Sequence, residues 1–559
     1  MNRKLTLPAF ALAMMVGFSG CELSVANPNQ ADRERALASP DDVETLIASS
    51  FQNYWGETHY YNTNTMALNH MSSRHTATWG NYGMDDLGRE PRAPLPNSAS
   101  YNYSYVFESP WQDHYGAISA ATDGIRALDA GLEIGDGGER NARARTWATF
   151  VQGLSSCNLA LTYDQAFVVD ETVDLGGELT TIPHDQMLDF ALGKLDAAEQ
   201  LARSNSFTLQ ETWLPGNGNM TNTVFADLIR SYKARCRANG PRTPGDAAAV
   251  NWSQVAADAA AGAELIVFGA GTQDAWWDGM KVYGTENATW HRQHMDWAGM
   301  GDISGEYQDW LTFATELRLP RQMDFVDQRY PANNVSGEKG LYHRYNSNCA
   351  PFRPERGMYR QSCYGDFRWD DYRLSCAGCW TGDMPEVIDR ELRLYEAEAA
   401  FRMGDIPTTV AIVNETRVAN GGLPAVVDGG TVPGGANCTP RKRYDSTGTC
   451  GDLEDALIWE HFEEIFWLSG GLEFWHGRRY GILPAGTALH FPIPAQDLEV
   501  LQLPIYTFGG LGNEGSAPVP AVIPGNLDNA LERAAVALAG QQARLRELTR
   551  NVQSGNIIR

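Results

Sequence analysis

The sequence predicts a mainly α-helical protein in which pairs of helices stack on one another and long loop-rich insertions separate some of the pairs. Segments with apolar residues at helical spacing recur along the chain. Short polar turns join them two by two, and the intervals between the pairs are irregular. A single helix pair cannot bury both of its apolar faces, so it needs neighbours to pack on. This pattern is typical of a tetratricopeptide-like stack, which is an α-α superhelix.

Residues 1–20 have the pattern of a lipoprotein signal peptide. Arg3 and Lys4 form a positive start, and residues 5–18 form an apolar core that is too short to span a bilayer. The sequence FSGC that ends at Cys21 resembles a lipobox, where the signal is cut and the cysteine receives lipid. We expect a mature protein that is anchored to a membrane and does not span it. The alternative is a plain secretory signal with a chance cysteine.

After the signal, we expect a polar linker over residues 21–40 and a single domain over residues 41–559. Asp41 and Asp42 are expected to cap the first helix, which runs through Phe51. Residues 54–105 are aromatic and irregular, which indicates loop structure. Further helices are expected over residues 111–132, 143–167, 184–202, 223–238 and 252–268.

The clearest helix pair lies in residues 386–426. Gly404 and Asp405 break the apolar periodicity, and Pro407 suits the first turn of a second helix. The run from Asn420 to Gly422 then ends that helix. The alternative is an ordinary helical hairpin of no special class.

Two insertions and a C-terminal extension complete the predicted organisation. The first insertion covers residues 269–385 and is dense in Trp, Tyr, Asp and Gly, whereas the second covers residues 428–452 and is rich in Gly. Helix resumes over residues 453–468. The extension covers residues 512–559 and contains a predicted helix, which we expect to pack on its own domain and not to form a coiled coil.

The acidic composition excludes some classes of partner. The formal net charge is −25 and the isoelectric point is about 4.8. No basic stripe is present to neutralise phosphates, so nucleic acid is not an expected partner. Charge also disfavours docking on anionic lipid.

Cysteine usage agrees with export to an oxidising compartment. Nine cysteines are present, and removal of Cys21 leaves eight, an even number. We expect most of them to be oxidised, and two pairs would each close a short loop. Zinc held by the four neighbouring cysteines of the first insertion is the alternative, although their spacing is loose. The favoured pairs are Cys349 with Cys363 and Cys438 with Cys450, and Cys157 and Cys236 could bridge two stacked hairpins; Cys376 and Cys379, which form a CxxC, are the remaining candidates.

The chain resembles the SusD/RagB family of surface lipoproteins that serve nutrient uptake in certain Gram-negative bacteria. The resemblance rests on the lipobox at Cys21, on the hairpin with the sequences ELRLYEAEA and NETRV, on the segment from Glu463 to Arg479, and on the sequence FPIP that starts at Phe491. It implies the SusD-like helical fold, an extracellular position on the outer membrane, and a SusC-like TonB-dependent transporter as partner. It also implies no catalysis and no cofactor. The C-terminal extension departs from the family pattern.

Patterns of known enzymes are absent from the sequence. No GxSxG, HExxH, P-loop or Rossmann fingerprint occurs, and no EF-hand-like pattern argues for calcium. His291, His294 and Asp296 have a spacing that could imitate a metal site, but a solvated loop is the favoured interpretation. The acidic pairs Asp85-Asp86 and Asp370-Asp371 could serve a glycosidase, although adjacent side chains usually point apart. We therefore expect no enzyme and no metal, with an exported hydrolase as a minor alternative.

The expected ligand site lies where two aromatic regions meet. One is the segment from Trp79 to Tyr82, whose place after the first helix resembles that of a binding loop in starch-binding relatives. The other is the insertion after the third helix pair. Aromatic rings stack on the apolar faces of sugars, and an amide can bond their hydroxyls. We expect an oligosaccharide ligand, with a peptide as the alternative; the rings could also simply fill small cores under the loops. The candidate residues are Trp79, Asn81, Tyr82, Trp276, Trp277, Tyr283, Trp290 and Trp310.

Overall fold

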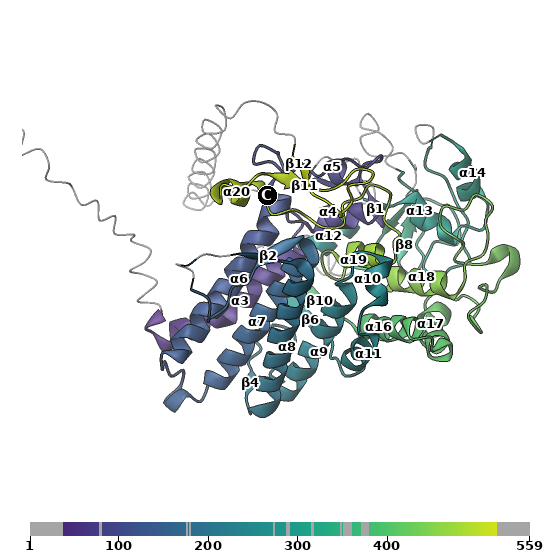
Figure 1. Cartoon of the computed structure of the whole chain (residues 1–559). Coiled ribbons are helices and arrows are strands. Elements are labelled where there is room, and N and C mark those ends of the chain that lie inside the picture. The colour runs from purple at the N-terminus through teal and green to yellow at the C-terminus, as the bar shows by residue number, and fades with distance from the viewer. Residues whose placement is uncertain are drawn as a thin grey trace, which may run out of the picture.

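The computed structural model describes residues 37–77, 81–174, 177, 180–271, 274–286, 291–314, 318–346, 349, 360–370 and 380–521. Long helices lie side by side in one half of the molecule, and loops, short helices and two-stranded sheets form the other half (Figure 1). The predicted mainly α-helical, helix-pair architecture is confirmed. Among the described residues, none of the helices combines the length and the apolar character that a membrane span requires. The predicted signal peptide, the lipidation site Cys21 and the predicted C-terminal helix lie outside the described residues.

The first part of the stack is built around α7, which packs against its neighbours on several sides. Because α7 touches α3, α6, α8 and α9, nearly all of its side chains from Arg143 to Thr162 are buried. A helix that is covered on all sides carries mainly apolar or small side chains around its whole circumference. Figure 1 shows α6, α7, α8 and α9 side by side. The elements are α3 (Pro40–His59), α6 (Tyr105–Asp129), α7 (Asn141–Thr162), α8 (His184–Ser204) and α9 (Asn222–Asn239).

The stack continues through α11 and the predicted hairpin. The turn of that hairpin is confirmed, because Asp405 accepts a hydrogen bond from the backbone of Thr408 at 3.2 Å and Pro407 occupies the first turn of α17. Asp452 caps α18 by accepting from the backbone of Glu454 and Asp455. The elements are α10 (Pro244–Ala248), α11 (Trp252–Ala260), α16 (Asp389–Arg402), α17 (Ile406–Ala419), α18 (Leu453–Ile465), α19 (Leu472–Arg479) and α20 (Ala495–Val500).

The start of the domain corrects two expectations. Ser39, and not the Asp41-Asp42 pair, caps α3, because its hydroxyl accepts from the backbone N–H of Asp42. The helix also continues to His59, since Tyr54 and Trp55 extend its buried face where a loop was predicted. Two short helices follow, α4 (Thr65–Met71) and α5 (Met84–Gly88).

A strand replaces the end of the helix that was predicted over residues 252–268. Helix α11 ends at Ala260, and β6 (Leu265–Gly269) pairs antiparallel with β10 (Gly382–Val387). Buried and exposed residues alternate along β6, as they do along a strand with one covered face. This ladder joins the two ends of the predicted insertion over residues 269–385 and closes its base.

The insertion is not pure loop but contains short helices and strands. Strand β7 pairs with β1, and β8 pairs with β9. These elements are β1 (His75–Thr76), α12 (Gly279–Glu286), β7 (Arg292–Gln293), α13 (Met295–Ala298), α14 (Glu306–Thr312), β8 (His343–Tyr345) and β9 (Tyr364–Asp366). Further two-stranded pairs are β2 (Gln165–Phe167) with β3 (Thr181–Pro183), β4 (Thr208–Leu209) with β5 (Met220–Thr221), and β11 (Tyr506–Thr507) with β12 (Val519–Pro520).

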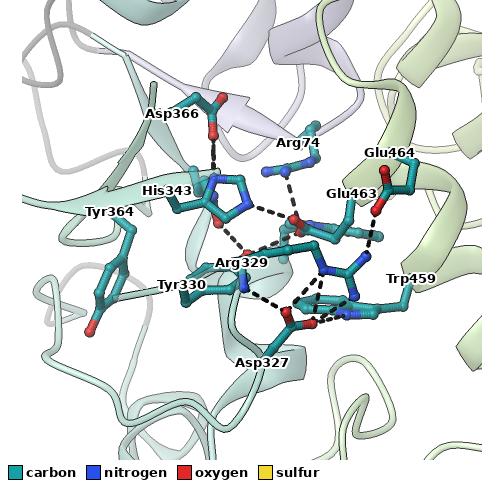
Figure 2. A network of polar contacts seen from close by, with 12 residues as sticks. Arg74, Asp327, Arg329, Tyr330, His343, Tyr364, Asp366, Trp459, Glu463 and Glu464 are labelled. Carbon is teal, nitrogen blue, oxygen red and sulfur yellow. Dashed lines mark hydrogen bonds and ion pairs between the residues drawn. The ribbon is translucent and has the colours of Figure 1, made fainter. Parts of the chain in front are cut away.

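A buried ionic network fastens the insertion to α18 (Figure 2). The guanidinium of Arg329 donates to Asp327 at 2.7 Å, to Glu460 at 2.8 Å and to Glu464 at 3.3 Å. All four side chains are fully buried. Buried charges of this kind are tolerated only when each one is paired and hydrogen-bonded.

His343 links the same helix to strand β9. Its two ring nitrogens lie 2.8 Å from an oxygen of Asp366 and 2.5 Å from an oxygen of Glu463 (Figure 2). Burial lowers the pKa of His343, but the two carboxylates outweigh burial and raise it above the ordinary value. The imidazole is therefore held as a cation between two anions.

Three disulfides occur among the described residues. Cys157–Cys236 joins α7 to α9, Cys349–Cys363 lies in the first insertion, and Cys438–Cys450 closes a loop in the second. Each is a pair that the sequence predicted. A zinc site made of the four neighbouring cysteines is contradicted by the Cys349–Cys363 bond, while Cys376 and Cys379 lie outside the described residues.

Candidate functional site

An open pocket with aromatic walls lies where the helical stack meets the insertion. Its volume is about 700 Å³. Four separate segments contribute to its lining, namely the end of α3 with the turn that follows it, the residue Tyr82 before α5, helix α6, and the segment before α12. The aromatic lining residues are Tyr60, Tyr61, Tyr82, Tyr105 and Trp277.

The rings of the pocket pack against one another in a fixed arrangement. Tyr61 is central, because it stacks on Tyr60 with ring centroids 4.6 Å apart and meets Tyr82 edge to face at 5.0 Å. Trp277 meets Tyr60 edge to face at 5.3 Å. Aromatic pairs prefer such offset and edge-to-face geometries. The wall is therefore a preformed set of four half-buried tyrosine rings and the buried ring of Trp277.

Backbone conformation at two positions makes this packing possible. Gly279 lies against Tyr61 and Trp277, and a Cβ at that position would come within 2.9 Å of both rings. Tyr82 has a φ of 57°, a left-handed conformation that is unfavourable for a bulky residue. Strain of this kind persists where the surrounding structure requires it, and it clusters at binding sites.

Polar groups around the rings supply hydrogen-bonding capacity. Asp113 of α6, Asp274 before α12 and the exposed Asn62 all line the pocket. Burial raises the pKa of Asp113. Beneath it, burial and then the charge of Asp113 raise the pKa of the buried Glu57 well above its ordinary value. The phenol pKa values of Tyr60 and Tyr82 are also raised, chiefly by burial, so their hydroxyls stay protonated and can donate.

The structure brings together only some of the residues that the sequence nominated. Tyr82 and Trp277 line the pocket, and Tyr283 lies behind the wall, stacked on Tyr61. Asn81 precedes Tyr82 and is partly exposed, but it is not part of the lining. Trp79 and Trp290 lie outside the described residues.

Two nominated tryptophans are core residues, which corrects the expectation that they are exposed anchors. Trp310 is 0% exposed, because Tyr307 packs on it and the guanidinium of Arg318 covers its ring at 4.6 Å. Trp276 is 6% exposed and packs between Phe51 and Trp55. Neither ring presents a face to a ligand in this structure.

Comparison with solved structures identifies the architecture. A SusD superfamily protein from Bacteroides vulgatus aligns with a TM-score of 0.52 and 14% identity, over 83% of this chain and 97% of that chain. A SusD superfamily protein from Parabacteroides distasonis aligns with a TM-score of 0.50 and 13% identity, over 84% of this chain and 97% of that chain. This chain has the SusD fold. Comparisons with family sequence models and with curated proteins find no match.

Within this SusD fold, sequence reasoning missed most of the pocket, including three of its five aromatic residues. Tyr60, Tyr61 and Tyr105 were noted only as part of an aromatic stretch, and Asp113 was not singled out at all. The adjacent pair Tyr60-Tyr61 directly after the buried face of α3 was the available signal. Asp113 has no such signal, because its approach to Tyr60 depends on how α6 packs on α3.

The predicted histidine motif is not a solvated loop, and two of its members, His294 and Asp296, bring ligand atoms within 4.8 Å of one another and of Glu90. His291 and His294 are both buried. His294 lies 3.2 Å from Glu90 and 3.4 Å from Asp296, whereas His291 packs against the ring of His70. The guanidinium of Arg360 bridges Glu90 at 2.7 Å and Asp296 at 3.0 Å, so these carboxylates already have a cationic partner.

A second group of side chains that could ligate a metal is also paired with an arginine. Glu398, His461 and His476 bring their ligand atoms within 4.8 Å of one another. However, Arg479 donates to both oxygens of Glu398 and to Nδ1 of His476 at 2.9 Å. A divalent cation at this position would meet a guanidinium on its carboxylate.

The members of the acidic pairs that the structure describes lie beside cationic side chains. Asp86 bonds Arg89 at 2.6 Å and the hydroxyl of Tyr101 at 2.8 Å, and Asp85 lies 3.9 Å from Arg89. Asp370 faces Arg344 at 3.5 Å and Lys339 at 3.8 Å, while Asp371 lies outside the described residues. The structure therefore places these acids in ion pairs.

Proposed function

We propose that this protein is a surface lipoprotein that binds an oligosaccharide nutrient in the aromatic pocket and passes it to a SusC-like TonB-dependent transporter. The observation that carries the proposal is the set of aromatic rings from four segments around one open pocket, four of them half-buried tyrosines, with Asp113, Asp274 and Asn62 beside them. The SusD fold and the lipobox at Cys21 support the setting on the outer membrane.

The chemistry of the pocket suits a sugar chain. Sugar rings present apolar C–H faces, which stack on Tyr and Trp rings, and they carry many hydroxyl donors. Carboxylates and amide oxygens accept hydrogen bonds from those hydroxyls, and the protonated phenols of Tyr60 and Tyr82 can donate in return. A concave, largely preformed site with a few convergent polar groups is the usual form of a small-ligand site.

A panel of ligands tests the proposal. Purified protein that starts after residue 21 is titrated with neutral oligosaccharides of several linkages and with short peptides, by calorimetry. We expect saturable binding of at least one oligosaccharide and loss of that binding in a Tyr60→Ala/Tyr82→Ala double variant. If only peptides bind, the ligand is a peptide and not an oligosaccharide. Binding that survives the double variant would place the site elsewhere.

A hydrolase is the second candidate, because one observation favours it. An acid whose pKa burial has raised, as for Asp113, is what a glycosidase uses as its general acid. Such an enzyme also needs a second carboxylate that faces the bond to be cleaved. The same panel is therefore incubated for hours and examined for shortened chains by mass spectrometry. Intact ligands support a binding protein, and cleavage that Asp113→Asn abolishes would show an enzyme.

The anchor and the partner are tested in cells. Cys21 should carry lipid, which mass spectrometry of membrane-extracted protein detects, whereas a soluble protein that retains Ser19 would contradict the anchor. An anchored binder has no channel of its own, so uptake requires a transporter. Deletion of the transporter gene should leave surface binding intact and abolish uptake of the bound ligand.

A further inference from the structure

A second cavity lies between the start of α8, the segment from Arg237 to Asn251, and the C-terminal loops. Its volume is about 790 Å³. It shares no lining residue with the aromatic pocket, so it is a separate site. Its inner wall includes Arg242, Pro241, Leu489 and His490.

Two buried polar side chains in this cavity have unused hydrogen-bonding atoms. His490 is 5% exposed, and neither of its ring nitrogens has a hydrogen-bond partner among the residues that the structure describes. Arg242 is 4% exposed, and within the same described residues its Nε also lacks a partner. A buried polar atom without a partner destabilises the fold, so these atoms are available to bond a ligand.

Two arginines lie at the inner wall, and burial lowers the pKa of both, that of Arg242 to about 9. Arg242 donates only to the backbone carbonyls of Gly240, Ala160 and Tyr163. Arg478 lies directly behind the wall and donates to the carbonyls of Pro241 at 3.0 Å and Leu489 at 2.8 Å. Among the described residues neither guanidinium forms an ion pair with a carboxylate, which is unusual for buried arginine.

The arginines also lower the pKa values of the two histidines that line the cavity. Burial, followed by the positive charges of Arg242 and Arg478, lowers the pKa of His184 to about 3. Burial and the same two arginines, together with His184, lower the pKa of His490 well below its ordinary value. Both imidazoles are neutral at physiological pH, so each can donate one N–H to an anion.

The outer rim has the opposite charge. Asp185 and Asp189 of α8 and Asp246 of α10 line the mouth of the cavity, and all three side chains are exposed. Glu514 adds a fourth carboxyl group to the lining. Leu188 and Leu192 form apolar wall between the two charged regions. The cavity is thus positive at its closed end and negative at its open end.

We propose that this cavity binds a small zwitterion, such as a free amino acid. The ligand carboxylate would lie at the closed end, where it accepts from His490 and Arg242 and faces the charge of Arg478. An ammonium group would lie at the rim beside Asp185 and Asp189. Neutral sugars lack the carboxylate, and a bare anion would meet the acidic rim on entry. This site does not depend on the proposed oligosaccharide function.

Calorimetric titration of the soluble full-length domain with three probes tests the proposal. L-lysine carries both charges, while acetate and n-butylamine carry one each. We expect lysine to bind at least tenfold more tightly than either of the other two. Equal affinities for the three probes, or no detectable lysine binding, would overturn the proposal.

Variants then assign the binding to this cavity. His490→Phe should abolish lysine binding, and Asp189→Lys should weaken it at least fivefold. Asp189 is exposed and no partner is found for it among the described residues, so its variant keeps the fold even if His490→Phe does not. Glu133→Lys is the matched control, because it also replaces an exposed carboxylate by lysine, at a position before the start of α7 and outside the cavity lining. This variant should bind lysine like wild type, as should Tyr82→Ala. Unchanged lysine affinity in Asp189→Lys contradicts the site.

Discussion

Tyr61 stacks on Tyr283 with ring centroids 4.1 Å apart and an angle of 26° between the ring planes. Tyr61 belongs to the turn after α3, and Tyr283 belongs to α12 of the insertion. The wall of the aromatic pocket therefore exists only when the insertion is packed on the helical stack. Binding at this wall reports on the joint between the two parts of the fold.

Loss of a pocket ring should separate binding from stability. Tyr82→Ala removes a half-buried ring of the wall, so we expect binding to weaken by about 1 to 3 kcal/mol with little change in melting temperature. Trp310→Ala removes a fully buried ring and should cost about 3 to 5 kcal/mol of stability while affinity per folded molecule is unchanged. Calorimetry and denaturant unfolding measure the two effects. The opposite pattern would make Trp310 the anchor and Tyr82 the core residue.

Loss of Arg329 should destabilise the insertion strongly. Arg329→Met leaves Asp327 and Glu460 as buried carboxylates without their cation, which costs about 3 to 5 kcal/mol. Arg89→Met removes an ion pair at the surface, where the loss is about 0 to 1 kcal/mol. Urea unfolding of both variants measures the difference. Equal midpoints for the two variants would show that the buried network contributes no more than the exposed pair.

The cation at His343 should make stability depend on pH on the alkaline side. Because its pKa is raised in the folded state, its contribution is fully present below about pH 6.5 and is lost as the pH rises through the folded pKa. The melting temperature of His343→Gln should therefore fall furthest below wild type near pH 6 and approach it toward pH 9. In contrast, burial lowers the pKa of His114 to about 3, so the deficit of His114→Gln should be constant between pH 7.5 and pH 9. A constant deficit for both variants would show that His343 is neutral.

The stabilising effect of the carboxylates of Asp366 and Glu463 should be lost in acid. Burial alone would raise the pKa of Asp366, but His75 and His343 hold it well below the ordinary value. The pKa of Glu463 is lowered in the same way by His343 and Arg74. Stability from these acids is present above their unfolded pKa values of about 4 and is lost as the pH falls through the folded values. Asp366→Asn should lose less stability than wild type between pH 5 and pH 3 in thermal scans.

The disulfides should differ in their effect on stability. The Cys157–Cys236 bond spans 79 positions in the sequence, and the Cys438–Cys450 bond spans 12. In the chain-entropy model, the longer loop stabilises by about 4 to 5 kcal/mol and the shorter by about 3 kcal/mol. Paired Cys→Ala variants compared in denaturant should show the larger loss for Cys157 and Cys236. A larger loss at Cys438 and Cys450 would contradict that order.

Helical periodicity predicted the stack well, because a buried helix face repeats every three to four residues and leaves a local record in the sequence. The turn at Asp405 and Pro407 was readable for the same reason, since capping depends on neighbours in the chain. The strand β6 was missed because its partner β10 lies more than a hundred positions away. A short apolar run does not by itself distinguish strand from helix.

The site was only partly predictable for a related reason. Aromatic residues in a loop-rich insertion can face a ligand or a local core, and composition is identical in the two cases. Trp276 at 6% exposure and Trp277 at 8% both pack into the main core, and of the two only Trp277 also lines the pocket. Only the path of the backbone decides between them. The ionic network around Arg329 was equally hidden, because its partners come from distant segments.

The β6–β10 ladder brings the two ends of the insertion together at the edge of the stack. Its register runs from Gly269 opposite Gly382 to Leu265 opposite Val387, so the chain leaves the stack and returns to it at adjoining positions. The entropic cost of closing a loop grows only with the logarithm of its length, by about 0.6 kcal/mol for each doubling. Exposed loops within the intervening segment can therefore lengthen or shorten while α11 and α16 keep their places. This segment carries Asp274 and Trp277 into the pocket. A sequence change in its exposed loops can therefore alter ligand preference while the helices of the stack stay in place.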